Sequence, residues 1–108
     1  MLNGVYDKLK TMNCVHNHAQ FSSRFLGRGE RHFDYLRSTR SQASIATLSI
    51  LAARLTEAAF ALAGAATWQS EARQMEALSE VVRDELTRRS LEISRPLLIP
   101  LRVPLNTI

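Results

Sequence analysis

Residues that interrupt helices or cross-link a chain are scarce in this sequence of 108 residues, which has one cysteine, three prolines and four glycines. A single cysteine excludes an intrachain disulfide framework, and reduced cysteine is typical of the cytoplasm, where we expect the protein to act. Glycine and proline are the poorest helix formers, so their scarcity favours helices. The sequence also lacks a phosphate-binding glycine loop and a Gly-x-Ser-x-Gly nucleophile elbow. We therefore expect no enzymatic activity and no cofactor.

Leucine and alanine are abundant instead, with fifteen and thirteen residues, and both are strong helix formers. Hydrophobic residues make up 45% and charged residues 22% of the chain, which are ordinary values for a globular protein. The length is typical of one domain, since domains usually span about 100–200 residues. We predict an all-α fold over residues 1–94, a small bundle built on a long two-helix hairpin with an N-terminal helix, followed by an extended tail over residues 95–108.

Apolar spacing predicts the first two helical segments. In residues 3–26 the apolar positions recur at steps of four and three, as on an amphipathic helix, and Asn13 to Asn17 is a point where that helix can break. Residues 31–64 predict a central helix that is apolar almost all round and therefore buried on several sides, with a stripe of Ile45, Leu48, Leu51, Ala52, Leu55, Ala59 and Leu62. We expect this helix to be most accessible at Arg54 and Glu57.

A third helix is predicted from Trp68 to about Ile93, because Gly64 and Thr67 are typical of a helix end and a new N-cap. We expect Trp68 to close the core at the turn. The rest of its apolar stripe is Ala72, Met75, Leu78, Val82 and Leu86. The last two helices are predicted to form an antiparallel hairpin, and a kink at Gly64 in place of a turn would instead make one long rod.

The tail has prolines at positions 96, 100 and 104, separated by mostly apolar residues. Each proline removes a backbone N–H and clashes with the preceding turn, so we predict extended backbone there. Because the apolar side chains need cover, we expect this tail to lie in a groove of its own bundle or of a partner.

Positive charge is concentrated near the N-terminus. Residues 1–40 contain seven cations and three acidic residues, whereas residues 41–94 contain five and seven. This distribution suits an acidic partner surface. The alternative is a nucleic-acid-binding module, with aromatic stacking by Phe33 and Tyr35 beside the cations Arg24, Arg28, Arg31, Arg37 and Arg40.

Neither a membrane segment nor a metal site is expected. The apolar stretch over residues 41–70 is interrupted by Arg54 and Glu57, and the uncharged runs on either side are shorter than the roughly 18 residues that a membrane span needs. Cys14, His16 and His18 are of the residue types that bind metals, and they lie close together in the sequence. They are only three, whereas a structural zinc site needs about four ligands. A surface histidine pair beside a small buried cysteine is the simpler interpretation, and binding of a metal by these three residues stays open.

A protein interface is the function that these patterns favour. The central helix, the third-helix stripe and the tail all need burial, which a homodimer or a partner complex would provide. The alternative is a monomer whose tail and first helix complete its core. Binding hot spots combine apolar anchors with arginines, so the predicted partner-binding residues are Phe33, Tyr35, Leu36, Arg37 and Arg40, and in the tail Leu98, Ile99 and Leu101.

One short resemblance makes this prediction more specific. The stretches His32 to Leu36, Gln42 to Ser44 and Thr47 to Leu51 together resemble part of the small all-helical antiactivators of LuxR-type quorum-sensing regulators. The resemblance spans about twenty residues. It implies a small helical protein that dimerises and sequesters a transcription factor by direct contact. We therefore expect a non-catalytic protein-binding regulator of this antiactivator kind.

Overall fold

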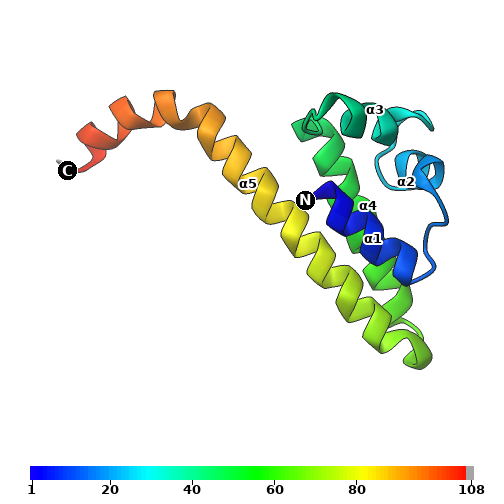
Figure 1. The fold of residues 1–108 in the computed structure, drawn as a ribbon. Coiled ribbons are helices and arrows are strands. Elements are labelled where there is room, and N and C mark those ends of the chain that lie inside the picture. The colour runs from blue at the N-terminus through cyan, green and yellow to red at the C-terminus, as the bar shows by residue number, and fades with distance from the viewer. Residues whose placement is uncertain (107–108) are drawn as a thin grey trace.

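The computed structural model describes residues 1–106, and it describes side chains for residues 1–93. The chain is all-α, as predicted, and α4 and α5 pack together as a long hairpin. Figure 1 shows α1 running along this hairpin beside α4, with α2 and α3 together near the N-terminal end of α4. The elements in chain order are α1 (Leu2–Thr11), α2 (His18–Arg24), α3 (His32–Thr39), α4 (Ile45–Ala63), the 3₁₀ turn η1 (Ala66–Trp68) and α5 (Gln69–Asn106).

The N-terminal segment breaks where its sequence allows. Asn13 ends the first helix in the left-handed conformation, with φ of 65°, which asparagine tolerates better than most residues. Asn17 then caps α2, because its side-chain oxygen accepts a hydrogen bond from the Gln20 backbone N–H at 2.9 Å. Residues 3–26 therefore form two short helices.

The central segment, predicted as one helix over residues 31–64, is also two helices. Arg40 adopts the left-handed conformation that commonly ends a helix, with φ of 52°. Ser44 is extended and accepts a hydrogen bond from the Thr47 N–H at 3.1 Å, so it starts α4 as an N-cap. The apolar pattern continues across this break because both helices bury residues in the same core, and the pattern alone did not show the break.

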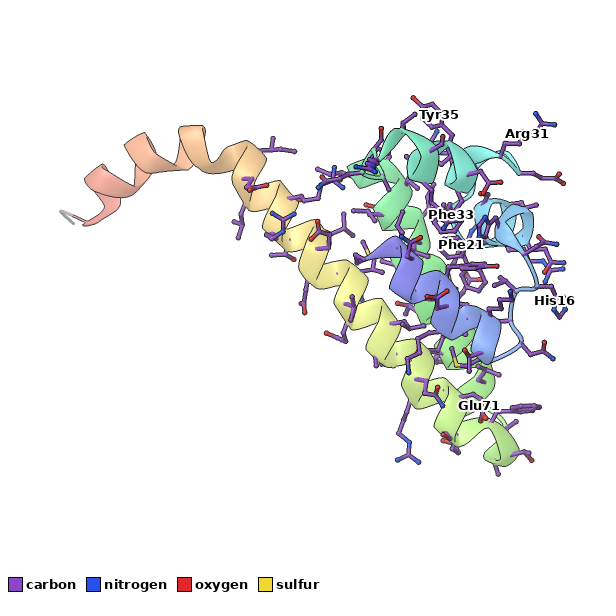
Figure 2. All side chains as sticks on the ribbon, viewed as in Figure 1. His16, Phe21, Arg31, Phe33, Tyr35 and Glu71 are labelled. Carbon is purple, nitrogen blue, oxygen red and sulfur yellow. The ribbon has the colours of Figure 1, made fainter. Side chains whose placement is uncertain are left out.

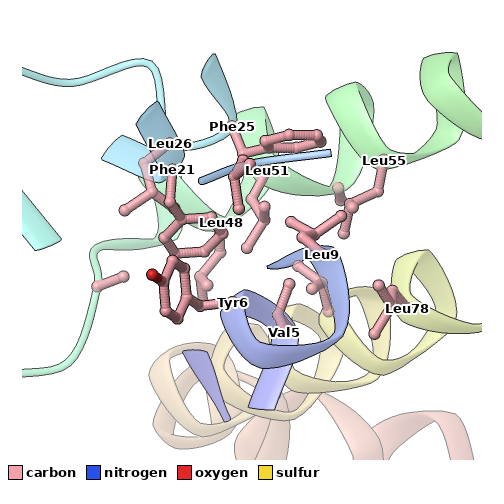
Figure 3. Close-up of a cluster of buried hydrophobic side chains, with 14 of the residues drawn as sticks. Val5, Tyr6, Leu9, Phe21, Phe25, Leu26, Leu48, Leu51, Leu55 and Leu78 are labelled. Carbon is pink, nitrogen blue, oxygen red and sulfur yellow. The ribbon is translucent and has the colours of Figure 1, made fainter. Parts of the chain in front are cut away.

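The core lies between α1, α2, α3 and the hairpin (Figure 3). Leu48, Leu51 and Leu55 occupy the inner face of α4 and are at most 1% exposed, as predicted. They meet α1, α2 and α5 through a buried set that includes Val5, Leu9, Phe21, Met75, Leu78 and Val82. Three expectations for α4 are wrong in part. Ile45 and Leu62 of the predicted stripe are only partly buried, and Arg54 is held against α2. Burial on several sides was also expected, but within the described residues no helix covers the side that carries Phe60, which is exposed.

Trp68 lies outside the core, contrary to prediction. Its side chain is 49% exposed, whereas Ala72, Met75, Leu78 and Val82 of the same predicted stripe are buried. The 3₁₀ turn explains the difference, because three residues per turn do not keep Trp68 in phase with the α-helical stripe that follows. Gly64 and Ala65 make a genuine turn, so the alternative of one long rod does not apply.

The backbone of α5 is helical as far as Asn106, whereas the sequence predicts extended backbone over residues 95–108. The prolines at 96, 100 and 104 recur at intervals of four, so the missing N–H groups fall on one side of the helix. Loss of hydrogen bonds on one side allows bending, and α5 curves along this C-terminal part, away from the body of the protein (Figure 1). Residues 107–108 lie outside the described residues.

Within the described residues, α4 is the one helix long and apolar enough to cross a membrane by length and composition. Of its apolar stretch, 33% is buried inside the protein. Its buried side supplies the core leucines described above, so the packing of the bundle accounts for the apolar residues on that side.

Candidate partner-binding groove

A groove of about 960 Å³ lies between α3, the α3–α4 connection, the start of α1 and the middle of α5. Its apolar lining includes Leu2, Phe33, Leu36, Ala43 and Leu48, and its charged lining consists of Asp34, Arg37, Arg40, Glu85, Arg88 and Arg89. An apolar floor with a charged rim is the composition expected of a binding surface.

Helix α3 supplies the floor of the groove because Phe33 and Leu36, three positions apart, lie on its inner face. Both are at most 5% exposed. The Phe33 N–H donates a hydrogen bond of 2.8 Å to Oγ of the buried Ser22, which ties the start of α3 to α2. The Arg37 guanidinium lies over the Phe33 ring, 5.8 Å from its centre, in a cation–π contact. The rim arginine is thus positioned by the floor.

Helix α5 supplies the opposite wall. The Arg89 guanidinium donates a hydrogen bond to the Ala43 carbonyl, which joins α5 to the α3–α4 connection. Arg88 pairs with Glu85 at 2.7 Å and with Glu92 at 3.4 Å. The hydrogen bond from Arg88 holds the pKa of the Glu85 carboxyl below its ordinary value, so this carboxylate stays charged at neutral pH.

The charge of the groove is positive. Four arginines line it against two carboxylates. Glu85 is engaged by Arg88, and Asp34 accepts a hydrogen bond from His18 at 2.5 Å. Arg37 and Arg40 make no ion pair with a carboxylate among the described side chains. Arg37 Nη1 contacts Nε2 of His18 at 3.3 Å, so a ring nitrogen and the Phe33 ring hold this arginine in place and no carboxylate neutralises its charge.

The structure places four of the predicted partner-binding residues, Phe33, Leu36, Arg37 and Arg40, along this one groove. Phe33 and Leu36 are core residues that form its floor, and they are not the exposed anchors that were expected. Tyr35 is 57% exposed but points outward on the other side of α3, whereas Phe33 points inward (Figure 2). The side chains of Leu98, Ile99 and Leu101 lie outside the described residues.

Sequence reasoning missed the α5 side of the groove. Glu85, Arg88 and Arg89 match the charged surface of any amphipathic helix, so the sequence predicts nothing special for them. No local pattern in the sequence distinguishes charges that face a groove from charges that face bulk water.

The cluster of Cys14, His16 and His18 does not converge on one point. Cys14 Sγ contacts the Met12 carbonyl oxygen at 3.8 Å, and burial raises the pKa of its thiol. His16 is exposed at the outer side of the molecule (Figure 2). His18 packs edge-on against the rings of Tyr6 and Phe33, at 4.7 Å and 5.0 Å between centres. Among the described side chains no three His, Cys, Asp or Glu residues lie close enough to hold a metal ion.

Comparison with known proteins identifies a family and no characterised relative. The sequence profile of DUF6626, a family of unknown function, matches residues 2–95. No curated protein and no solved structure matches the chain significantly. The matched region contains all the groove-lining residues from Leu2 to Arg89.

Proposed function

We propose that this chain, which belongs to the family of unknown function DUF6626, is a non-catalytic regulator that binds an acidic segment of a partner protein in the groove between α3 and α5. The observation that carries the proposal is the pairing of an apolar floor, Phe33 and Leu36, with two rim arginines that have no carboxylate partner, Arg37 and Arg40. Such a surface suits a ligand that combines acidic and apolar side chains.

The resemblance to the antiactivators supplies one specific form of this proposal. The resembling residues include His32 to Leu36, and α3 forms one wall of the groove. In this form the partner is a LuxR-type transcription factor, and binding keeps it from acting. The protein acts by contact alone, with no chemical step.

Panning a peptide-display library on the protein tests the binding chemistry. We expect enrichment of segments that alternate Asp or Glu with Leu, Ile or Phe. In titration calorimetry with an enriched peptide, the Arg37→Glu/Arg40→Glu variant should bind roughly tenfold or more weakly, because arginines of this kind dominate hot spots. Arg73→Glu is the matched control, since Arg73 is an exposed α5 arginine outside the groove. Absence of such enrichment, or normal binding by the double variant, would refute the proposal.

Nucleic acid is the second candidate, and it would use some of the same cations. One of them is already engaged within the protein, because Arg28 Nε donates to Thr47 Oγ1 at 2.9 Å. Salt separates the two candidates. Binding of a short DNA duplex through several phosphate contacts would weaken by about 10³–10⁵ between about 50 and 200 mM salt, whereas binding at an apolar floor would change far less.

A further inference from the structure

The outer face of α4 is poor in charge although it faces solvent. Ala46, Ala53 and Phe60 recur at intervals of seven on this face, opposite the buried leucines, and all three are exposed. Phe60 is 84% exposed, the largest value among the large hydrophobic residues of the described chain. A hollow of about 470 Å³ lies beside it, lined by Ala52, Ala53, Thr56, Glu57, Phe60 and Arg83. A large apolar side chain thus stands next to a shallow apolar depression.

This face, which we call the Ala53 face (Ala46, Ser49, Ala53, Glu57 and Phe60), bears one charge. Glu57 is exposed and makes no ion pair among the described side chains. Depletion of charge and enrichment in aromatic residues are typical of the centre of a protein interface. The outer surface of α5 is different, because its exposed positions include Arg73, Glu76, Glu80 and Asp84.

We propose that the Ala53 face binds a second copy of this chain, as an antiparallel α4–α4 pair with a two-fold axis at Ala53. In this register each Phe60 lies level with the partner's Ala46, seven positions from the axis on either side. Each Glu57 lies level with the partner's Ser49, four positions from the axis, where a hydroxyl can donate to the carboxylate. The surface is therefore complementary to itself in size and in polarity, as a two-fold interface requires.

The parallel arrangement lacks this complementarity. It would set Phe60 against Phe60 and Glu57 against Glu57, and it would leave two alanines facing each other at position 46. Crowding, like-charge repulsion and a void all oppose it. The antiparallel pair places each large side chain against a small one, which allows the two helices to approach closely.

The size of the face also suits a dimer. A helix of the length of α4 extends about 28 Å at 1.5 Å per residue. A phenylalanine buries roughly 150–250 Å². Two Phe60 rings would thus supply a large part of the about 1,000 Å² that a specific interface needs, and the flanking alanines and α5 residues would supply the rest. The two hollows share no lining residue, so this dimer is independent of the partner-binding groove.

Sedimentation equilibrium tests the association. At micromolar concentration we expect twice the chain mass of 12.2 kDa for the unaltered protein and the single chain mass for Phe60→Glu. Val81→Glu is the matched control, since Val81 is an exposed apolar residue, 48% exposed, that lies outside both hollows. Circular dichroism should show an unchanged helical spectrum for both variants. A monomeric unaltered protein, or a dimer unaffected by Phe60→Glu, would overturn the proposal.

A charge exchange tests the register. Ser49→Glu should weaken the dimer roughly tenfold, because it sets a carboxylate level with the partner's Glu57. Adding Glu57→Lys to that variant should restore the dimer, because the charges are then opposite. Failure of the second substitution to restore association would exclude this antiparallel register.

Cross-linking tests the axis. In a Cys14→Ser background, Ala53→Cys should form an intermolecular disulfide under mild oxidation, because residues on the axis approach within the distance that a disulfide spans. Ala77→Cys, on the exposed side of α5, should not. Equal cross-linking of the two variants would contradict the proposal. Binding to phosphatidylcholine vesicles would also contradict the proposal if Phe60→Glu abolished it, because the Ala53 face would then contact lipid.

Discussion

The Arg54 guanidinium closes the C-terminal end of α2. Its Nη1 donates to the Ser23 carbonyl at 2.9 Å and to the Arg24 carbonyl at 2.5 Å. Carbonyls in the last turn of a helix have no partner within the helix, so a cation from another element both satisfies them and complements the helix dipole. A single side chain thus links α4 to α2.

Arg54→Ala should therefore destabilise the protein by about 1–2 kcal/mol, since it removes two charge-assisted hydrogen bonds. The measurement is urea unfolding followed by circular dichroism. Arg73→Ala, at an exposed position of α5, should change the free energy of unfolding by less than about 0.5 kcal/mol. Equal effects of the two substitutions would show that the Arg54 contacts contribute no stability.

Leu55 tests the burial of α4. Its side chain is 0% exposed, in the cluster shared with α1 and α5 (Figure 3). Leu55→Ala should cost about 2–5 kcal/mol, the range for truncating a fully buried leucine. Val81→Ala, at a position 48% exposed, should cost far less by the same thermal or denaturant measurement. A loss below about 1 kcal/mol for Leu55→Ala would contradict this packing.

The α3–α4 corner is the element on which the groove depends. Arg40 ends α3 and Ser44 starts α4, so the short connection between them turns the chain and forms part of the groove wall. Ser44 Oγ accepts from the Thr47 N–H and donates to Thr47 Oγ1 at 3.0 Å, and Thr47 itself is buried. Without this cap, the apolar periodicity alone would favour one continuous helix through residues 31–64.

Ser44→Ala should destabilise the protein by about 1 kcal/mol, the usual cost of losing a serine N-cap. Ser44→Asp, which keeps a capping oxygen, should retain most of the stability. Thermal unfolding by circular dichroism measures both. An equal loss of stability for Ser44→Ala and Ser44→Asp would contradict this capping role.

At the scale of the whole molecule, the two proposed surfaces lie on different elements. The groove is formed mainly by α3 and α5, and the Ala53 face by the outer side of α4. Since no residue lines both hollows, a substitution should be able to abolish binding at one surface without affecting the other. A dimer in which both grooves remain open would present two partner sites.

We accordingly expect the Arg37→Glu/Arg40→Glu variant to remain a dimer, and the Phe60→Glu monomer to bind an enriched acidic peptide with unchanged affinity per chain. Sedimentation equilibrium and titration calorimetry on both variants provide the comparison. Loss of peptide binding in a folded Phe60→Glu monomer would show that the two surfaces are coupled.

Local sequence determined much of the fold, because apolar periodicity and capping residues act over a few positions. The steps of three and four from Leu48 to Leu55 predicted the buried face of α4, and Gly64 marked the turn of the hairpin. The break near Asn13 to Asn17 was visible for the same reason. Such patterns report which side of a helix is buried, and they hold whatever the partner helix is.

Tertiary structure determined which residues form the two surfaces, and apolar periodicity does not show this. Phe33 and Leu36 were predicted to be partner-binding anchors, but packing in the core buries both in the floor of the groove and leaves Tyr35 outside it. Arg88 and Arg89 resemble any solvated charges in the sequence, and they line the same groove as Arg37 and Arg40 only because the hairpin folds back. Phe60 is as apolar as a core residue, and its exposure depends on which helices cover α4. A local pattern fixes the buried face of one helix, whereas a surface shared by several helices depends on distances between residues far apart in the chain.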